Sequence, residues 1–167
     1  MARSSDDPRP TGDLLKPGTR VACVRSTYHA ELIDAMRDSA RAVLAESGLK
    51  DEHWLEVTVP GAFELPIVAQ RLAQREDVDA VLCFGLVLRG ETDHDRYISA
   101  SVAHALQTVG LSAEKPVLFG VLTPNNLEQA RARALCESEG GQDKGREVAR
   151  AAVEVLGALR RAEEVGR

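Results

Sequence analysis

The sequence predicts an α/β protein in which helices cover both faces of a parallel β-sheet. Short apolar runs alternate along the chain with longer segments whose apolar residues recur every three or four positions. That alternation is typical of strands joined by helical crossovers. Four strand-like runs are clear, so we expect a four-stranded parallel sheet in a three-layer αβα sandwich with right-handed connections. The chain has 167 residues, 44% of them hydrophobic, which suits one domain with a sizeable core.

The expected strands are short segments rich in apolar residues and bounded by polar residues, proline or glycine. They cover residues 20–24, 54–59, 80–84 and 116–122.

The expected helices carry an apolar stripe, as Leu32 and Met36 do in the first of them. Gly110 is predicted to end the third helix. Asn125 and Glu128 stand at the spacing of a capping box for the fourth helix. A turn at residues 137–142 precedes the last helix. The helices are expected at residues 30–47, 64–74, 94–109, 125–136 and 143–160.

The N-terminal segment differs in composition from the rest of the chain. Residues 1–16 are mostly polar and have little to bury, so we expect a disordered N-terminal tail there. Residues 17–167 show no internal repeat and no linker, so we expect them to form a single domain.

Composition also limits the class of protein. The chain has 21 Lys and Arg against 26 Asp and Glu, a formal net charge of −5. This acidic balance argues against a nucleic-acid partner. No apolar stretch is long enough to span a bilayer, and the N-terminus lacks an apolar signal core, so we expect a cytoplasmic protein without a membrane partner. Cys23, Cys83 and Cys136 form no C-x-x-C pair and are expected to be free thiols.

Unusual residues gather after the expected strands. In open parallel sheets, ligands bind beyond the carboxyl ends of the strands, so the loops that begin there are the candidate site. These loops hold two aromatic residues, two histidines, a glutamate and a Gly-Glu-Thr turn that opens a helix. They cover residues 26–29, 60–64, 88–94 and 123–126.

Three features of these loops point to chemistry, although each also has a structural explanation. The turn at residues 90–92 would present free backbone N–H groups to an anion, or bind nothing, as most such turns do. Arg133 could add a bidentate phosphate contact or could be a solvated helix residue. His94 could transfer protons or could simply lie on the surface. His29 could pair with His94 at a metal site, but no third ligand at metal spacing is evident, so no metal site is expected.

Two aromatic residues could hold a flat heterocycle. Tyr28 and Phe63 would usually plug the core or a loop, but aromatic rings at the ligand end of an α/β sheet can stack on a ring system. Glu64 follows at a helix start, where compensation of the helix dipole is the alternative explanation. These residues alone name no substrate.

Four motifs together resemble the lumazine synthase family. They occur in the family's order and with its spacing from about residue 20 to residue 159. They are VPGAFELP at 59–66, VLRGETDH at 87–94, FGVLT at 119–123 followed by Glu128-Gln129-Ala130 and Arg133, and DKG at 143–145.

The resemblance implies a flavodoxin-like fold and a transferase of riboflavin biosynthesis. The family joins 5-amino-6-(D-ribitylamino)uracil to 3,4-dihydroxy-2-butanone 4-phosphate and makes 6,7-dimethyl-8-ribityllumazine. An amine attacks a ketone, phosphate leaves and a ring closes. The protein therefore has to align two reactants, hold an anion and move protons, so no cofactor is expected.

The resemblance also assigns roles to individual residues. His94 would be the proton-transfer residue and Lys144 a supporting one. Phe119 would approach the pocket from a neighbouring subunit. The pyrimidine substrate would be held by Tyr28, Ala62, Phe63, Glu64, Leu86, Val87, Leu88 and Phe119. The phosphate would be held by Gly90, Glu91, Thr92 and Arg133.

Some positions depart from the family pattern. His94 is followed by Asp95 and Arg96, where the family usually has an aromatic residue and then an acid, and Ser101 replaces a usual acidic residue. These changes leave an alternative open: a catalytically weak paralogue that binds lumazine or flavin. A structural assembly subunit is a third hypothesis.

The resemblance extends to assembly. Sites between subunits of a five-fold ring imply a homopentamer, with riboflavin synthase as a further candidate partner. The stretch between Arg133 and Lys144 is a few residues longer than in shell-forming members. We therefore expect a pentamer or a pair of pentamers rather than a hollow shell of sixty subunits.

Overall fold

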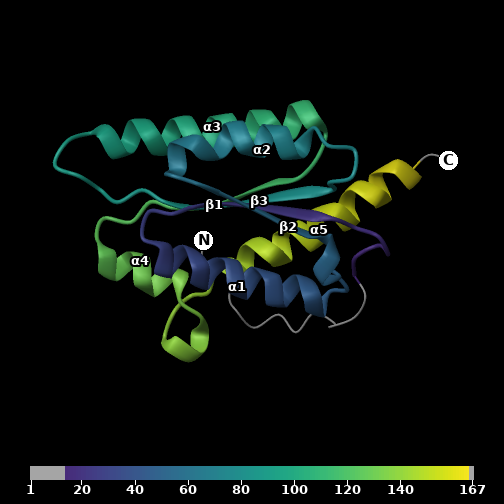
Figure 1. Ribbon diagram of the computed structural model, residues 1–167, viewed down its shortest axis with the longest axis horizontal. Helices are drawn as coiled ribbons and strands as arrows, with labels where there is room; N and C mark the ends of the chain where they lie inside the picture. The colour runs from purple at the N-terminus through teal and green to yellow at the C-terminus, as the bar shows by residue number, and fades with distance from the viewer. Residues whose placement is uncertain (1–13, 166–167) are drawn as a thin grey trace.

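The computed structural model describes residues 14–165 and has three layers (Figure 1). Helices α2 and α3 cover one face of the sheet, and α1, α4 and α5 cover the other. The strands are β1 (Val21–Ser26), β2 (Trp54–Val59), β3 (Ala80–Leu86) and β4 (Val117–Leu122). The helices are α1 (Ala30–Glu46), α2 (Leu65–Ala73), α3 (His94–Ala113), α4 (Leu127–Ala134) and α5 (Lys144–Glu164). Three short 3-10 turns are η1 (Asp51–His53), η2 (Ala62–Glu64) and η3 (Glu137–Glu139).

The sheet confirms the predicted fold class. All four strands are parallel and lie in the order β2-β1-β3-β4, which is the flavodoxin-like arrangement. The chain moves outward from β1 to β2 and then returns to build β3 and β4 on the other side. Because the strand order reverses between β1 and β3, a crevice for a ligand is expected at their carboxyl ends.

The core lies on both faces of β3. Every residue of this strand is buried, as its apolar sequence predicts. Leu82 and Phe84 pack towards α1 and α5, while Val81 and Cys83 pack towards α2 and α3. Burial of each large side chain contributes about 1.5–3 kcal/mol to the stability of the fold. The strand β3 is therefore a firm support for the loop that leaves its carboxyl end.

The cysteines are free thiols, as predicted. Cys23 and Cys83 are fully buried in separate cores, and Cys136 is half-buried. Burial raises the pKa of both the Cys23 and the Cys83 thiol well above the ordinary range. Within residues 14–165, no helix is long and apolar enough to cross a membrane.

The start of the described chain differs from the expected tail. Leu15 is only 5% exposed, and its backbone N–H donates to the Ser47 carbonyl at 3.1 Å. Ordered packing therefore begins before residue 17, because Leu15 joins the core beside α1. Residues 1–13 of the expected tail lie outside the described residues.

Two predicted helix boundaries were wrong. Gly110 does not end α3, which continues to Ala113 and ends where Glu114 adopts a left-handed conformation with φ 53°. The cap of α4 is Asn126 rather than Asn125. The Asn126 side chain accepts from the Gln129 N–H, and the Gln129 side chain accepts from the Asn125 N–H, both at 2.9 Å. Gln129, and not Glu128, thus completes the capping box.

The start of α5 is locked against α1 by the motif at residues 143–145. Asp143 is 1% exposed and accepts hydrogen bonds from the Ser39 hydroxyl at 2.6 Å and from the Arg146 N–H at 3.0 Å. At Gly145, an added Cβ would overlap the Met36 carbonyl oxygen. This motif therefore has a structural reason: only glycine lets the two helices approach so closely.

We predict that Gly145→Ala lowers the free energy of unfolding by at least about 2 kcal/mol, because the backbone of α1 would have to move. Gly157→Ala in the same helix is the matched control. There an added Cβ meets only the tips of Arg160 and Arg161, so alanine should be neutral or stabilise by up to about 1 kcal/mol. Urea unfolding at one fixed protein concentration measures both. Equal effects of the two changes would contradict the packing argument.

Candidate active site

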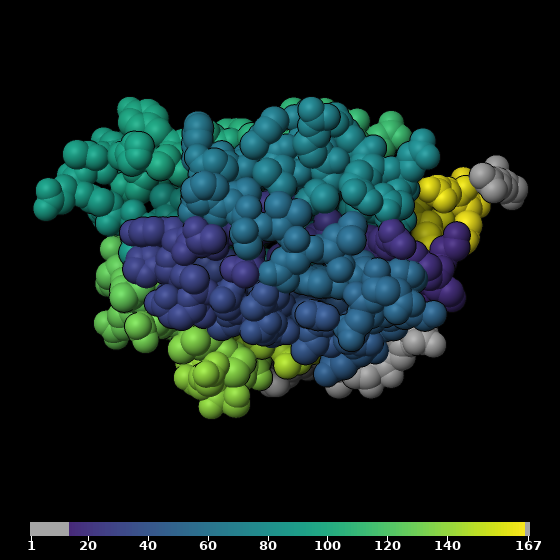
Figure 2. Space-filling model, viewed as in Figure 1, coloured from purple at the N-terminus to yellow at the C-terminus, as the bar shows by residue number. Residues whose placement is uncertain are grey.

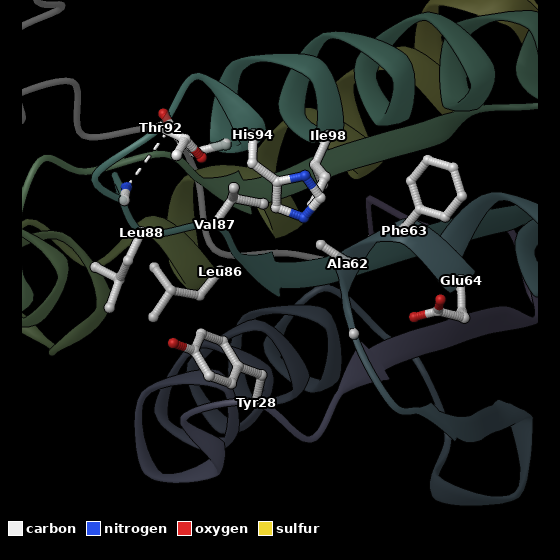
Figure 3. A pocket seen from close by; sticks show the side chains of 13 residues that line it. Tyr28, Ala62, Phe63, Glu64, Leu86, Val87, Leu88, Thr92, His94 and Ile98 are labelled. Atoms are coloured by element: carbon white, nitrogen blue, oxygen red, sulfur yellow. Dashed lines mark hydrogen bonds between the residues drawn. The ribbon is translucent and has the colours of Figure 1, made fainter.

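One cavity of about 600 Å³ opens beyond the carboxyl ends of β1, β2 and β3. Its walls come from three loops and from the start of α3 (Figure 3). The volume and the mostly apolar lining are typical of small-molecule sites. The lining residues are Tyr28, Gly61, Ala62, Phe63, Glu64, Leu86, Val87, Leu88, Gly90, Thr92, His94, Asp95 and Ile98.

The floor of the cavity is a continuation of β3. Leu86 and Val87 are 2% and 8% exposed. The Val87 N–H donates to the Leu122 carbonyl at 2.8 Å, and the Arg89 N–H donates to the Pro124 carbonyl at 3.1 Å. These bonds extend the pairing of β3 beyond Leu86, so the backbone at the floor is held by the sheet itself.

Exposed aromatic rings lie around this floor. Tyr28 is 51% exposed and Phe63 is 61% exposed. The Tyr28 loop is tied to β2 because the Thr27 N–H donates to the Val59 carbonyl at 2.9 Å. Figure 3 shows Tyr28 on one side of the cavity and Phe63 on η2, with Ala62 between them. Solvent-exposed rings on anchored loops can stack on a flat ligand.

His94 is the first residue of α3 and is exposed. Its imidazole points into the cavity from the side opposite Tyr28, and Ile98 lies one turn further along the helix (Figure 3). The connection from β3 to α3 projects from the body of the protein (Figures 1 and 2). In this connection the Gly90 N–H donates to the Asp95 carboxylate at 3.3 Å. An acid–base group therefore lies beside an anion-binding type of turn.

The structure brings most of the expected site residues together. Three lining residues were not expected: Gly61, Asp95 and Ile98. Ile98 could have been found from sequence, because it lies four positions after His94 and so on the same helix face. Gly61 belongs to a loop already identified. Nothing in the sequence pattern indicated that the Asp95 carboxylate turns back to Gly90.

Four expected residues do not line this cavity: Glu91, Phe119, Arg133 and Lys144. Phe119 is paired with Cys83 in the middle of the edge strand β4 and is 38% exposed. Arg133 is exposed in the last turn of α4, which covers the face of the sheet opposite α2 and α3. The Lys144 ammonium pairs with Glu147 at 2.7 Å.

No group of three or more potential metal ligands occurs among residues 14–165. The lining residues themselves offer one imidazole and the carboxylates of Glu64 and Asp95.

The fold and the cavity define a class of protein: an α/β protein that holds a small molecule between loops at the carboxyl edge of a parallel sheet. The sequence profile of the 6,7-dimethyl-8-ribityllumazine synthase family matches residues 18–160. The chain belongs to this family.

Individual relatives carry the same family name. The 6,7-dimethyl-8-ribityllumazine synthase of Thermus thermophilus is 40% identical over 145 residues, which cover 86% of this chain and 89% of the relative. That of Aquifex aeolicus is 38% identical, with 86% and 92% covered. That of Kineococcus radiotolerans is 42% identical over 156 residues, with 93% and 94% covered. The likeness thus extends over nearly the full length of each relative.

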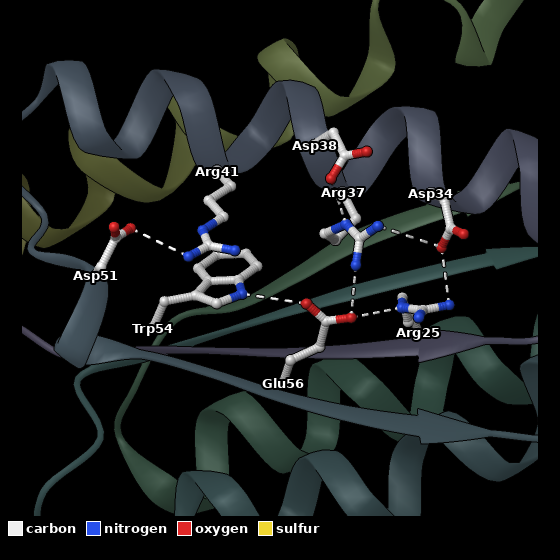
Figure 4. A network of polar contacts seen from close by, with 8 residues as sticks. All are labelled: Arg25, Asp34, Arg37, Asp38, Arg41, Asp51, Trp54 and Glu56. Carbon is white, nitrogen blue, oxygen red and sulfur yellow. Dashed lines mark hydrogen bonds and ion pairs between the residues drawn. The ribbon is translucent and has the colours of Figure 1, made fainter.

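A charged network supports the loop that carries Tyr28 (Figure 4). The Glu56 carboxylate of β2 pairs with Arg25 of β1 at 2.6 Å and with Arg37 of α1 at 2.7 Å. Arg25 also pairs with Asp34 of α1 at 2.8 Å. The Trp54 indole N–H donates to Glu56 at 3.2 Å. These contacts join β1 and α1, which flank the loop, to the neighbouring strand β2.

The network lowers the pKa of Glu56. Partial burial alone raises this pKa, but the hydrogen bonds from Arg25 and Trp54 and the positive charges of Arg37 and Arg25 outweigh the burial. The charged form of Glu56 is therefore favoured in the folded protein, and a lowered carboxyl pKa stabilises the fold wherever that carboxyl is ionised.

We predict that Glu56→Gln lowers the free energy of unfolding by about 1–3 kcal/mol at neutral pH, because two half-buried guanidinium groups lose their shared anion. Glu56 has a lowered pKa when folded, so its contribution is complete above about pH 5 and is lost as the pH falls through the folded pKa. Chemical unfolding between about pH 7 and pH 3 should therefore show wild type and variant converging in acid.

Glu52→Gln is the control, because Glu52 is exposed in η1. A Glu56→Gln effect no larger than that of the control, or one that grows in acid, would contradict the role given to the network.

Proposed function

We propose that this chain condenses 5-amino-6-(D-ribitylamino)uracil with 3,4-dihydroxy-2-butanone 4-phosphate to form 6,7-dimethyl-8-ribityllumazine in riboflavin biosynthesis. One observation carries the proposal. The chain belongs to this family, and its cavity is lined by exposed aromatic rings, a glycine turn at a helix start and a histidine. The floor of the cavity combines the apolar side chains and the backbone of residues 86–88. These are the groups that the condensation of a flat amine with a phosphate ester requires.

The pyrimidine substrate fits the apolar half of the cavity. Its flat ring stacks beside Tyr28 or Phe63, and the backbone of residues 86–88 faces the ring's polar edge. The Glu64 carboxylate lies close to the backbone of Gly61, since an added Cβ there would be 3.1 Å from its oxygen. From that position it accepts hydrogen bonds from the ribityl hydroxyls.

The phosphate of the second substrate fits the turn at residues 90–92. This turn precedes α3, a helix of 20 residues, whose free N–H groups and positive dipole end favour an anion. Gly90 and Thr92 line the cavity, so a substrate held there by its phosphate can bring its ketone carbon, two carbons along the chain from the phosphorylated carbon, to the amine of the pyrimidine.

The reaction then needs alignment and proton transfer. The substrate amine attacks the ketone and water leaves, which forms an imine. Phosphate departs with the electrons of its C–O bond, an enol forms, and the second amine closes the ring with loss of water. His94 is placed beside both substrates to give and take the protons of these steps. All the bonding changes occur within the two substrates, so no redox cofactor takes part.

A second copy of the chain completes the site. Phe119 and Arg133 are both exposed, and both lie outside the cavity of their own chain. Exposed apolar side chains on η2 and α2, Phe63 and Ile67 at 61% and 62%, indicate a surface that a further subunit covers. A ring of identical subunits would bring Phe119 and Arg133 of one copy to the cavity of the next. Riboflavin synthase and a cytoplasmic location stay predictions.

The direct test is product formation from the two purified substrates, followed by the absorbance of the lumazine. We predict turnover that is unchanged after dialysis against a chelator. Tight binding of lumazine without turnover would favour the weak paralogue instead. Loss of activity that a divalent ion restores would overturn the metal-free mechanism.

We predict that His94→Ala lowers turnover about tenfold to a thousandfold, as expected for a positioned acid–base group, with little change in pyrimidine affinity. His104→Ala is the matched control, because His104 is exposed on the same helix and does not line the cavity. Steady-state kinetics with both substrates measures the effect. If the two variants behave alike, His94 has no part in the chemistry.

The turn before α5 sets a limit on assembly. It forms η3 and projects from the body below α4 and α1 (Figure 1). Its backbone is closed by hydrogen bonds from Gly141 to the Cys136 carbonyl at 3.0 Å and from Gln142 to the Ala132 carbonyl at 2.8 Å. A rigid projection of this kind would keep pentamers from packing into a closed shell.

We predict a pentamer of about 90 kDa, five times the chain mass of 18.1 kDa, or a pair of such pentamers. Light scattering behind a sizing column gives the mass. A particle of about one megadalton would contradict the role of the turn, and an active monomer would contradict the shared site.

A further inference from the structure

A carboxylate already occupies part of the proposed phosphate site. The Asp95 side chain accepts from the Gly90 N–H at 3.3 Å and lines the cavity. It is half-buried, whereas residues 89–94 around it are exposed. We propose that the Asp95 carboxylate competes with the substrate phosphate for the anion-binding turn and so weakens phosphate binding. This inference rests on the proposed function, since it assigns the turn to phosphate.

The start of α3 explains why a carboxylate settles there. Asp93 is the N-cap residue, but its side chain makes no capping hydrogen bond. Asp95 is the one acidic residue in the first turn of the helix, where a negative charge is stabilised by the dipole and by free N–H groups. In the protein without substrate, Asp95 thus supplies the charge that phosphate oxygens would supply.

Neighbouring charges do not cancel this carboxylate. Arg96 pairs with Asp93 at 3.6 Å, and both side chains are largely exposed. Arg89 and Glu91 are exposed in the connection, and His94 points into the cavity. Among residues 14–165, no ion pair joins Asp95 to a lysine or arginine. The Ser99 hydroxyl donates to the Asp95 backbone carbonyl at 2.7 Å, a contact that does not involve the Asp95 carboxylate.

The competition affects both the binding of the phosphate substrate and the release of inorganic phosphate. A phosphate ester gains the Gly90 N–H only when the Asp95 carboxylate withdraws, and the two anions repel each other while both remain near the turn. Asp95 therefore weakens the binding of the phosphate substrate. It also helps to expel inorganic phosphate after the C–O bond has broken, because the carboxylate returns to the same N–H group.

The test uses inorganic phosphate as the probe and the full chain in its native assembly. We expect Asp95→Asn and Asp95→Ala to bind phosphate about three- to tenfold more tightly than wild type in calorimetric titrations, because each removes the competing charge. Asp93→Asn is the matched control, since it removes the same charge from the same connection outside the cavity. It should change phosphate affinity less than about twofold, because its charge is exposed to solvent.

A second readout separates competition from structural support. In steady-state kinetics, Asp95→Asn should lower KM for the phosphate substrate and leave KM for the pyrimidine unchanged. Weaker or equal phosphate binding in both Asp95 variants, or no phosphate binding in any protein, overturns the inference. If Asp95→Asn tightens phosphate binding but no protein forms lumazine, the inference stands and the proposed function fails. If wild type turns over normally and the variants show no gain, the function stands and the inference fails.

Discussion

The structure depends on the burial of four parallel strands between two layers of helices. A parallel sheet has little stability with a bare face, and β3, buried along its whole length, needs both layers. Because all four strands point the same way, their carboxyl ends meet at one edge of the sheet. The loops that leave this edge are therefore neighbours in space although they are distant in sequence, and the cavity is the space that they enclose.

The two halves of the site are supported differently. The apolar half rests on β3 and on the charged network that ties β1, β2 and α1 together, so its backbone is fixed before a ligand arrives. The half proposed to hold phosphate lies on the exposed connection to α3, where the Gly90 N–H donates to the Asp95 carboxylate. A half held by the sheet for the flat ring and an exposed half for phosphate suit the proposed reaction, which keeps one ring system and releases one anion.

Local patterns predicted much of this structure. Apolar periodicity located the four strands and the buried faces of α1 and α2, because apolar residues recur along the chain with the period of the face that each element buries. The rule that ligands bind at the carboxyl edge located the loops of the site. The end of α3 was missed because Gly110 lies within the helix, where its backbone packs close to Lys115 and Val117. The turn of Asp95 towards Gly90 was missed because a side-chain direction is not a periodic property. Phe119 and Arg133 lie on β4 and α4, outside the cavity of their own chain, and the spacing of a motif along the chain does not predict such a separation in space.

The central claim is that one chain forms most of the site and that a second copy completes it with Arg133. Mixed refolding of His94→Ala and Arg133→Ala subunits tests this claim most directly. If each site takes His94 from one subunit and Arg133 from its neighbour, an equal mixture should recover about one quarter of wild-type activity, because a quarter of random neighbour pairs have both residues intact. If each chain completes its own site, every site stays defective. Activity no higher than that of the separate variants would then contradict the account.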